Sequence, residues 1–340
     1  MPTTPPESVD HLQRSANGCL CCGSDDLQFE TQIVSGFLAS RAWGGPPQLT
    51  QLVSCRACSL RFFDRGLSDS ETARYYRAYR DAEYVRARWS WEPFYTQGQH
   101  AALLAWSESP LRQMAVRAAL AGSKAPERFA SVLDHGGDQG HLLGAVEADR
   151  KAVFDPSARA TLPSIDRYTE VSTLPGNWEL ILSCQVLEHV SSPAAYLKEL
   201  GALLADSGWL YIEVPTENWR PAPGSPGLRT AWLKLLLRWR PLLMAADVLC
   251  TVSRIKLGRL PPLGFVAMRE HLNYFSADAL AAILAAGGLT IKDCGINRVG
   301  QLYAIAQKSV TVDGMMNRSL ESQFPLLDSE EQTNNRLVTR

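Results

Sequence analysis

The segment that most constrains the fold is an apolar run that ends in an acid and leads at once into a glycine-rich turn, Val132-Leu133-Asp134-His135-Gly136-Gly137-Asp138-Gln139-Gly140. Glycines are needed where backbone approaches a ligand closely, and a helix that starts after such a turn offers free N–H groups. A second apolar run ends in Asp155, where a carboxylate can accept both hydroxyls of a ribose. The pattern predicts a nucleotide site on a strand, turn and helix. Because Asp155-Pro156-Ser157 is also good turn chemistry, a capping role for Asp155 stays open.

The spacing and charge of this loop favour S-adenosylmethionine over a dinucleotide. A dinucleotide fold asks for G-x-G-x-x-G, so that the pyrophosphate can lie on the loop. The glycines at 136, 137 and 140 do not give that spacing. An acid beside the loop, Asp134, repels a pyrophosphate but suits a sulfonium or an ammonium group.

From Phe129 onwards, short apolar runs alternate with helical segments, which is the pattern of βαβ units around a parallel sheet. We predict strands at 131–133, 152–154, 179–183, 209–214, 290–293 and 303–307, and helices near 140–148, 192–205 and 277–286. Between Pro215 and Met268 the alternation gives way to a Pro-, Trp- and Leu-rich insertion. The fold class is therefore α/β, with a Rossmann-like sheet and helices on both of its faces.

The chain divides into five predicted parts. These are a polar lead (1–16), a cysteine-bearing module (17–66), a helical connector (67–125), a cofactor-binding domain (126–310) with a helical insertion at 216–268, and a polar tail (311–340). In the connector we expect one helix over 68–88, which begins at the capping signature Ser68-Asp69-Ser70-Glu71, and a second over 97–121.

In these segments the chain resembles class I S-adenosylmethionine-dependent methyltransferases, whose first motif reads acid-x-Gly-x-Gly-x-Gly. The segment 178–190, which ends in Leu187-Glu188-His189-Val190, is similar to that family's fourth strand, and 208–215 is similar to its fifth. The resemblance implies cofactor contacts at Asp134, Gly136, Gly137, Gly140, Asp155, Gln185 and Leu187. Where the family usually has its middle glycine this sequence has Asp138, so a non-catalytic protein that has lost the cofactor is one alternative.

The cysteines form a second motif. Five of the eight fall in the first 58 residues, and four of them make two C-x-x-C pairs, Cys19/Cys22 and Cys55/Cys58. Four thiolates suit tetrahedral Zn²⁺, so we predict a structural zinc site with these ligands. The two pairs lie further apart than in a common zinc ribbon, so an inserted hairpin is expected between them. Cys21 is a fifth thiol that can replace Cys19 or Cys22, and an oxidisable thiol cluster is the alternative.

Paired C-x-x-C motifs before a methyltransferase core resemble the sugar C-methyltransferases of deoxysugar biosynthesis and related polysaccharide-cluster enzymes. The segment Arg269-Glu270-His271-Leu272-Asn273-Tyr274-Phe275-Ser276 is similar to their Glu-His-Leu-x-Tyr-Phe-Ser motif. The match implies that His271 is the general base and that Glu270 orients it or holds a substrate hydroxyl. His189 is a rival or partner of His271, and a purely structural role for His271 is the alternative. Those enzymes carry a further α/β domain after the core, and only a polar tail follows Val310 here, so methylation of oxygen fits as well as methylation of carbon.

Composition narrows the acceptor. Lys and Arg number 34 against 35 Asp and Glu, a formal net charge of −1, which gives no basic excess for gripping nucleic acid. We therefore expect a small-molecule or glycan acceptor, and an RNA- or protein-modifying methyltransferase is the alternative. The sequence contains no secretory signal and no apolar run of membrane-spanning length, so a cytoplasmic location is expected.

The insertion is locally basic. Over 220–260 there are eight Lys or Arg and one acid, Asp247, interleaved with Trp and Leu. We expect two short helices, broken at Pro241. They form either a lid over the active site or a peripheral contact with the inner face of a membrane or with a lipid-linked glycan. The tyrosine-rich segment at 75–80 either faces the substrate pocket or packs between the zinc module and the core.

Overall fold

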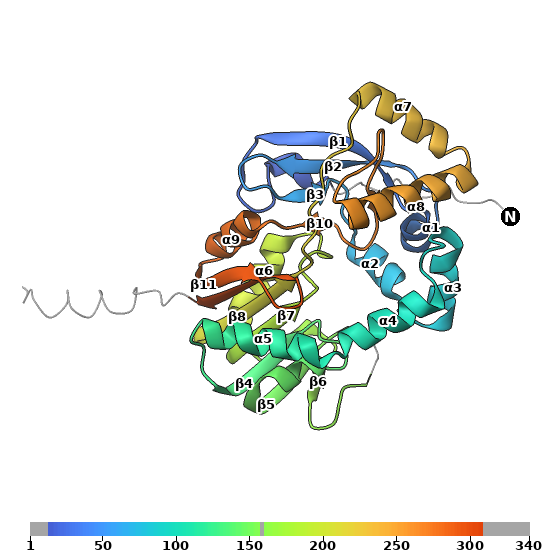
Figure 1. The fold of residues 1–340 in the computed structure, drawn as a ribbon. Helices are drawn as coiled ribbons and strands as arrows, with labels where there is room; N and C mark the ends of the chain where they lie inside the picture. The colour runs from blue at the N-terminus through green and yellow to red at the C-terminus, as the bar shows by residue number, and fades with distance from the viewer. Residues whose placement is uncertain (1–12, 157–159, 309–340) are drawn as a thin grey trace, which may run out of the picture.

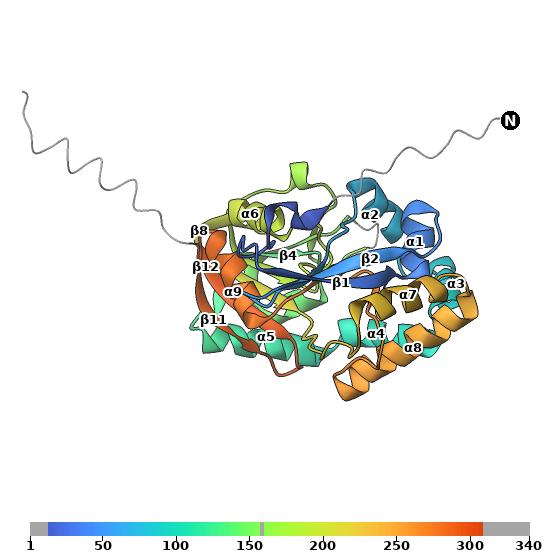
Figure 2. The ribbon, with the colours of Figure 1, turned by 90° about the horizontal axis from the view of Figure 1, so that it is seen from above.

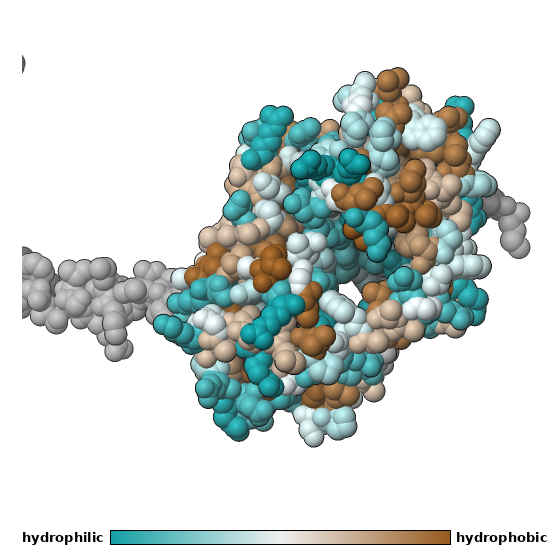
Figure 3. All heavy atoms as spheres, viewed as in Figure 1, coloured by the Kyte–Doolittle hydropathy of each residue, from teal (hydrophilic) through white to brown (hydrophobic). Residues whose placement is uncertain are grey.

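Two β-sheets organise the chain (Figure 1). A seven-stranded sheet has the order β11-β12-β8-β7-β4-β5-β6, and a five-stranded sheet has the order β10-β3-β2-β1-β9. The computed structural model describes residues 13–156 and 160–308, so most of the predicted lead and all of the predicted tail lie outside the described residues. The space-filling view is hollowed between the two lobes that these sheets build (Figure 3).

The larger sheet confirms the predicted α/β core. Its strands are β4 (Arg128–His135), β5 (Glu147–Phe154), β6 (Asp166–Tyr168), β7 (Trp178–Cys184), β8 (Leu204–Val214), β11 (Leu289–Ile296) and β12 (Leu302–Lys308). The first five run parallel, and β12 is antiparallel to both β8 and β11. Six of the seven strands were expected. The sequence does not reveal β6 because Asp166-Arg167-Tyr168 is short and mostly exposed and has no apolar run.

Helices cover both faces of this sheet, as predicted. On one face α6 (Pro193–Leu203) and α9 (Ala277–Ala286) bury Leu197, Leu200 and Leu280 against the strands. On the other face α5 (Pro110–Gly122) buries Val116 and Leu120. The strand ends that carry the glycine loop are therefore held by apolar packing from both sides.

The helix expected at 140–148 is wrong. Only a 3-10 helix, η2 (His141–Ala145), follows the glycine turn, and β5 already starts at Glu147. The pairing of Arg128 with Glu147 explains the difference, because it extends β5 toward its N-terminus and leaves six residues between Gly140 and the strand. A full helix N-terminus is therefore not part of the loop.

The smaller sheet combines two distant parts of the chain. It contains β1 (Leu27–Val34), β2 (Leu49–Cys55) and β3 (Arg61–Phe63), with the expected hairpin between the cysteine pairs broken by α1 (Gly36–Trp43). It is completed by β9 (Ala267–Met268) beside β1 and β10 (Asn273–Tyr274) beside β3. The boundary predicted at residue 66 is thus incomplete, because the module also pairs with 267–274. This pairing fixes both ends of the short segment that carries Glu270 and His271.

The polar lead predicted at 1–16 overlaps an ordered segment that begins before residue 17. Arg14 opens a 3-10 helix, η1 (Arg14–Asn17), and its guanidinium is buried. It donates to the carbonyl oxygens of Phe63 at 2.9 Å and Ser191 at 2.8 Å and to Asn273 Oδ1 at 2.5 Å. Burial lowers its pKa to about 9. Arg14 therefore joins the cysteine module to loops that carry candidate site residues.

The connector has more helices than predicted: α2 (Asp69–Tyr76), α3 (Ala82–Trp91), α4 (Gln97–Ser107) and then α5. The capping box at Ser68 and Glu71 is confirmed. The second expected helix breaks because Pro110 lacks an N–H and takes the first position of α5, with Ser109 as its cap.

The insertion forms α7 (Pro226–Leu236) and α8 (Arg240–Leu257), separated by 237–239. The break near Pro241 is confirmed, although α8, at 18 residues, is not the short helix expected. Arg229 on α7 pairs with Glu30 on β1 at 3.0 Å, so the insertion packs on the smaller sheet (Figure 2). Among the described residues, no helix is long and apolar enough to cross a membrane.

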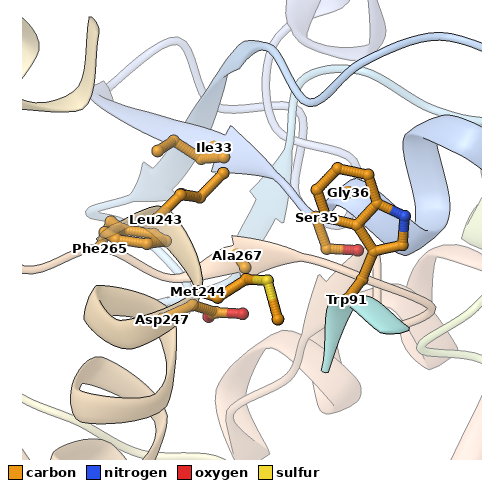
Figure 4. Close-up of a pocket in the computed structure, with 9 residues that line it drawn as sticks. All are labelled: Ile33, Ser35, Gly36, Trp91, Leu243, Met244, Asp247, Phe265 and Ala267. Atoms are coloured by element: carbon orange, nitrogen blue, oxygen red, sulfur yellow. The ribbon is translucent and has the colours of Figure 1, made fainter. Parts of the chain in front are cut away.

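Between the insertion and β1 lies a cavity of about 10 Å³ (Figure 4). That volume holds at most one water. Beside it, a Cβ on Gly36 would lie 2.1 Å from the Trp91 ring, so glycine allows α1 to approach α3. The cavity is a packing defect and not a ligand site.

Candidate functional site

The glycine loop connects β4 to η2 and has the geometry of a close backbone approach. Gly136 and Gly140 adopt φ of 82° and 84°, which favours glycine. A Cβ on Gly137 would lie 2.2 Å from Asp134 Cγ, and a Cβ on Gly136 would lie 2.5 Å from Val186 Cγ2. The three predicted glycines therefore lie where side chains do not fit, folded around Asp134 and against the loop that follows β7.

Asp134 is the buried acid of this loop. It is 1% exposed, and within the described part of the chain its Oδ2 has no hydrogen-bond partner. Burial raises its pKa to about 7, Arg112 opposes that shift, and the charges of Asp155 and Asp138 add to it. An unpartnered acidic oxygen beside a glycine loop is suited to a cationic or hydrogen-donating ligand group. The loop thus fits the predicted S-adenosylmethionine.

Asp138 replaces the glycine expected in the middle of the loop. It adopts φ of 51°, a conformation that Asp tolerates better than most residues. Its backbone N–H donates to Asp155 Oδ2 at 3.0 Å. Asp155 thus ties the glycine loop to the end of β5, and both its contact with a ribose and its role in the turn at 155–157 stay predictions.

The loop after β7 carries the next candidates. Gln185 adopts φ of 62°, and its side-chain amide donates to Glu213 Oε1 at 3.3 Å. Leu187 is fully buried in the core, and its predicted cofactor contact remains a prediction. Because β7 lies beside β4, this loop and the glycine loop meet at the same edge of the sheet.

Glu213, at the end of β8, holds this edge together and was missed from the sequence. It is fully buried and accepts from Arg112 at 3.1 Å, Asn297 at 2.7 Å and Tyr211 at 3.1 Å. Its signal was a lone acid in the otherwise apolar run Leu210-Tyr211-Ile212-Glu213-Val214.

The two candidate histidines are brought together on the other side of this loop. The ring centroids of His189 and His271 are 4.9 Å apart in an edge-to-face arrangement. His271 Nδ1 donates to Glu217 Oε1 at 2.7 Å, and His189 Nδ1 donates to the carbonyl oxygen of Glu270 at 2.9 Å. In both rings the Nε2 atom remains for other contacts.

The orienting role predicted for Glu270 is wrong. Its carboxylate accepts from Tyr75 at 2.5 Å and from Arg88 at 3.1 Å, and the acid that orients His271 is Glu217. Glu217 also pairs with Arg254 of α8. Sequence reasoning missed Glu217 because it lies in the irregular segment after β8, outside the resembling motif.

Burial and the charges of this cluster shift the pKa values of the two histidines in opposite directions. Burial opposes protonation of His271, but its hydrogen bond to Glu217 and the nearby charges of Glu217 and Glu188 raise its pKa to about 9. Burial and the charge of His271 lower the pKa of His189 to about 4. At neutral pH His271 is therefore a cation and His189 a neutral imidazole.

Glu188 completes the cluster. It is 1% exposed, and among the described residues neither of its carboxylate oxygens has a hydrogen-bond partner. Burial raises its pKa to about 7. Its Oε1 lies 3.7 Å from His189 Nε2, so the cluster has a buried acid next to the neutral histidine.

The four predicted zinc ligands converge. Cys19, Cys22, Cys55 and Cys58 place their sulfur atoms within 4.8 Å of one another, with Cys19–Cys58 at 3.5 Å and Cys22–Cys55 at 3.6 Å. Sulfurs that share one tetrahedral zinc at ~2.3 Å lie ~3.8 Å apart, so the cluster is compatible with a structural zinc site. Cys21 is buried outside this group.

The model of a methyltransferase domain family matches residues 109–293, which is more than half of the chain. The chain belongs to this methyltransferase family. The seven-stranded α/β sheet and the glycine loop agree with S-adenosylmethionine as the methyl donor of this enzyme. The predicted enzyme class, fold and cofactor are thereby confirmed.

Solved methyltransferase structures are similar at low identity. The 1,6-didemethyltoxoflavin-N1-methyltransferase of Burkholderia thailandensis is 17% identical with a TM-score of 0.42, covering 77% of this chain and 96% of that one. A putative S-adenosylmethionine-dependent methyltransferase from Listeria monocytogenes is 14% identical with a TM-score of 0.37, covering 59% and 100%. A methyltransferase from Aquifex aeolicus is 13% identical with a TM-score of 0.39, covering 61% and 98%. A search of curated protein sequences gives no match.

Proposed function

We propose that this methyltransferase acts on an oxygen or carbon of a small polar acceptor, a sugar or glycan precursor, with His271 as the general base. The observation that carries the proposal is the pair of His271 with Glu217 at 2.7 Å, since a carboxylate on Nδ1 fixes the tautomer and leaves Nε2 for the acceptor. His271 packs against His189, which lies on the same loop after β7 as Gln185, and this supports a base close to the predicted cofactor contacts.

The surroundings of the histidines support a polyol acceptor. The Tyr76 ring packs edge-on against His189, with centroids 6.5 Å apart, and Tyr75 hydrogen-bonds Glu270. Tyr79 packs in turn against Tyr76. Tyrosine faces, hydroxyl groups and buried carboxylates together suit a ring with several hydroxyl groups.

The chemistry assigns a part to each group. Bound S-adenosylmethionine supplies a methyl group on a cationic sulfur. During methyl transfer His271 would take the acceptor's proton on Nε2, and Glu217 would stabilise the resulting imidazolium. The glycine loop and Gln185 align the donor, and the second product is S-adenosylhomocysteine.

The zinc module supports this chemistry without taking part in it. Its cysteines, when they hold Zn²⁺, fix the turns beside β1, β2 and β3, and β3 pairs with β10 directly after His271. A structural metal thus supports the position of the base.

The test has two stages. Calorimetric titration of zinc-replete protein with S-adenosylhomocysteine is expected to show binding that Asp155→Ala weakens, because Asp155 ties the glycine loop to the end of β5. Transfer of labelled methyl to a panel of sugars and nucleotide sugars is then compared for wild type and His271→Ala. Full turnover by His271→Ala with unchanged cofactor binding would remove the base assignment.

One geometric feature calls for a control. Ligand atoms of Glu188, His189 and His271 lie within 4.8 Å of one another, a spacing that a divalent cation can bridge. Turnover is therefore also measured after EDTA treatment and with added Mn²⁺. If Mn²⁺ raises turnover and Glu188→Gln abolishes that effect, a bound metal, and not His271 as general base, would be the group that activates the acceptor.

A further inference from the structure

Helix α8 is apolar on two opposite faces. Its core face buries Leu243, Cys250 and Asp247, and the Asp247 carboxylate is paired with Arg269. The opposite face presents Leu249 and Val252, which are 60% and 50% exposed, and Ile255 beside them is 66% exposed. A helix that packs by one face is normally polar on the other, so this second face calls for a partner.

Helix α7 continues the same surface. It buries Leu233 and Leu236 and exposes Leu228 and Leu235, which lie on one face because they are seven residues apart. Trp239, in the link to α8, is 64% exposed. We call the exposed apolar residues of the two helices the α7–α8 surface: Leu228, Leu235, Trp239, Leu249, Val252, Ile255 and Leu257.

This surface is exceptional within the molecule. Of the fifteen large apolar side chains exposed in the described residues, these seven fall between 228 and 257. Single exposed apolar residues are ordinary, whereas a concentration of them marks an interaction site. Figure 3 shows hydrophobic side chains gathered over α7 and α8, with hydrophilic ones among them.

The charges around the surface are of one sign. The exposed cations of 220–260 are Arg220, Lys234, Arg238, Arg240, Lys256 and Arg259, and among the described residues none of these forms an ion pair with an acid. Lys256 lies on the same face of α8 as Leu249 and Val252. The one acid of the segment 220–260, Asp247, is buried and bound by Arg269 at 2.7 Å. The surface is therefore both apolar and positively charged.

We propose that the α7–α8 surface docks on an anionic lipid bilayer, with Trp239 and the leucines in the interface and the cations at the headgroups. Basic side chains interleaved with Trp and Leu match such a surface. A second copy of the same face fits poorly, because it would bring the exposed cations of α7 and α8 against one another. The proposed attachment is peripheral, through one exposed face of α7 and α8.

The docking surface is connected to the candidate base. Arg254 of α8 pairs with Glu217, and Glu217 orients His271. An acceptor held at the bilayer would thus be presented beside the helix that supports the base. The docking stands on its own observations and does not require the proposed acceptor.

The test is co-sedimentation of the full-length, zinc-replete protein with vesicles. We expect pelleting with phosphatidylcholine–phosphatidylglycerol vesicles, weaker pelleting at high salt, and none with phosphatidylcholine alone. The double variant Leu249→Asp/Val252→Asp should lose it. The matched control is Leu111→Asp/Met114→Asp on α5, which changes two similarly exposed apolar residues by the same charge and should pellet like wild type.

A charge variant separates the two contributions. Lys234→Gln/Lys256→Gln should weaken partitioning by about fivefold for each cation removed. No pelleting by the wild type, or equal loss in both aspartate variants, would overturn the proposal. So would a dimer in light scattering that Leu249→Asp/Val252→Asp dissociates, since the surface would then join two copies. S-adenosylhomocysteine binding, measured on the same samples, reports separately on the methyltransferase site.

Discussion

Glu217 Oε1 lies 2.7 Å from His271 Nδ1, and the other oxygen of that carboxylate is held by Arg254 of the insertion. Three segments far apart in the sequence meet at this pair: the end of β8, helix α8 and the loop between β9 and β10. Burial raises the pKa of Glu217, but His271 and Arg254 outweigh burial and lower it to about 2, so the acid is ionised at any ordinary pH. The charge state of His271 is therefore set largely by the carboxylate that orients it.

This pair predicts a rate that rises with pH. The pKa of His271 is raised to about 9, above its ordinary 6.5, so below pH 9 the ring is mostly protonated and cannot accept a proton. As pH rises through about 9 the neutral base accumulates, and kcat should rise and then level off. Glu217→Gln removes the carboxylate that raises this pKa, so its profile should shift to lower pH.

A kcat profile over neutral to alkaline pH, taken at saturating cofactor, checks this. A flat profile in the wild type would assign the base to His189, since its pKa of about 4 leaves it neutral throughout that range. Binding of S-adenosylhomocysteine at each pH separates loss of base from loss of cofactor.

The glycine loop gives a second prediction. A Cβ on Gly137 would lie 2.2 Å from Asp134 Cγ, so Gly137→Ala must move the acid or the loop. We expect cofactor affinity to fall by about tenfold or more, equivalent to ~1.4 kcal/mol, while the fold persists. The control is Gly201→Ala on α6, where a Cβ meets nothing within 4 Å and alanine favours the helix. Equal calorimetric affinities in wild type and Gly137→Ala would show that the loop does not approach the cofactor.

The sequence and the structure agree where local pattern determines structure. The six predicted strands of the larger sheet each contain apolar residues, and α9 has the limits expected from Ser276 as its cap and a following glycine. The spacing of the cysteines also predicted which four come together. The predictions that were wrong concern elements held by contacts between residues far apart in the sequence. Strands β9 and β10 are two residues each and have no periodicity of their own, so only their pairing with β1 and β3 reveals them.

The predicted roles of functional residues were wrong for the same reason, because those roles depend on contacts between distant segments. Glu270 follows a motif and was assigned a role that Glu217 holds, because a motif does not reveal which acid the fold brings to His271. The helix expected after Gly140 does not form because β5 begins at Glu147. This extension depends on pairing with β4, which helix propensity does not predict. The sequence placed Arg14 in a polar lead. Its buried partners include backbone carbonyl oxygens, which every residue has and which therefore give no sequence signal.

The cysteine cluster predicts one zinc ion per chain. Cys22→Ser removes a ligand and should lose the metal, whereas Cys21→Ser alters a neighbouring thiol outside the cluster and should keep it. Because metal-binding free energy is folding free energy for such modules, Cys22→Ser should also melt at lower temperature. Elemental analysis with thermal unfolding checks both. Full zinc occupancy in Cys22→Ser, or its loss in Cys21→Ser, would contradict the ligand set.

Arg14 predicts a stability effect outside the site. Its guanidinium is buried and donates to carbonyl oxygens of Phe63 and Ser191 and to Asn273, which lie on both sides of the β3–β10 pairing. Arg14→Ala leaves these acceptors without donors, and we expect a loss of about 2–4 kcal/mol in the free energy of unfolding. Urea unfolding checks this against Arg56→Ala, whose ion pair with Asp26 is exposed and should contribute less than about 1 kcal/mol. Similar losses in both variants would mean that Arg14 does not join the module to the loops around His271. If Arg14 does join them, Arg14→Ala should also lower methyl transfer more than it lowers binding of S-adenosylhomocysteine, because β10 follows the proposed base directly and the predicted cofactor site is the glycine loop.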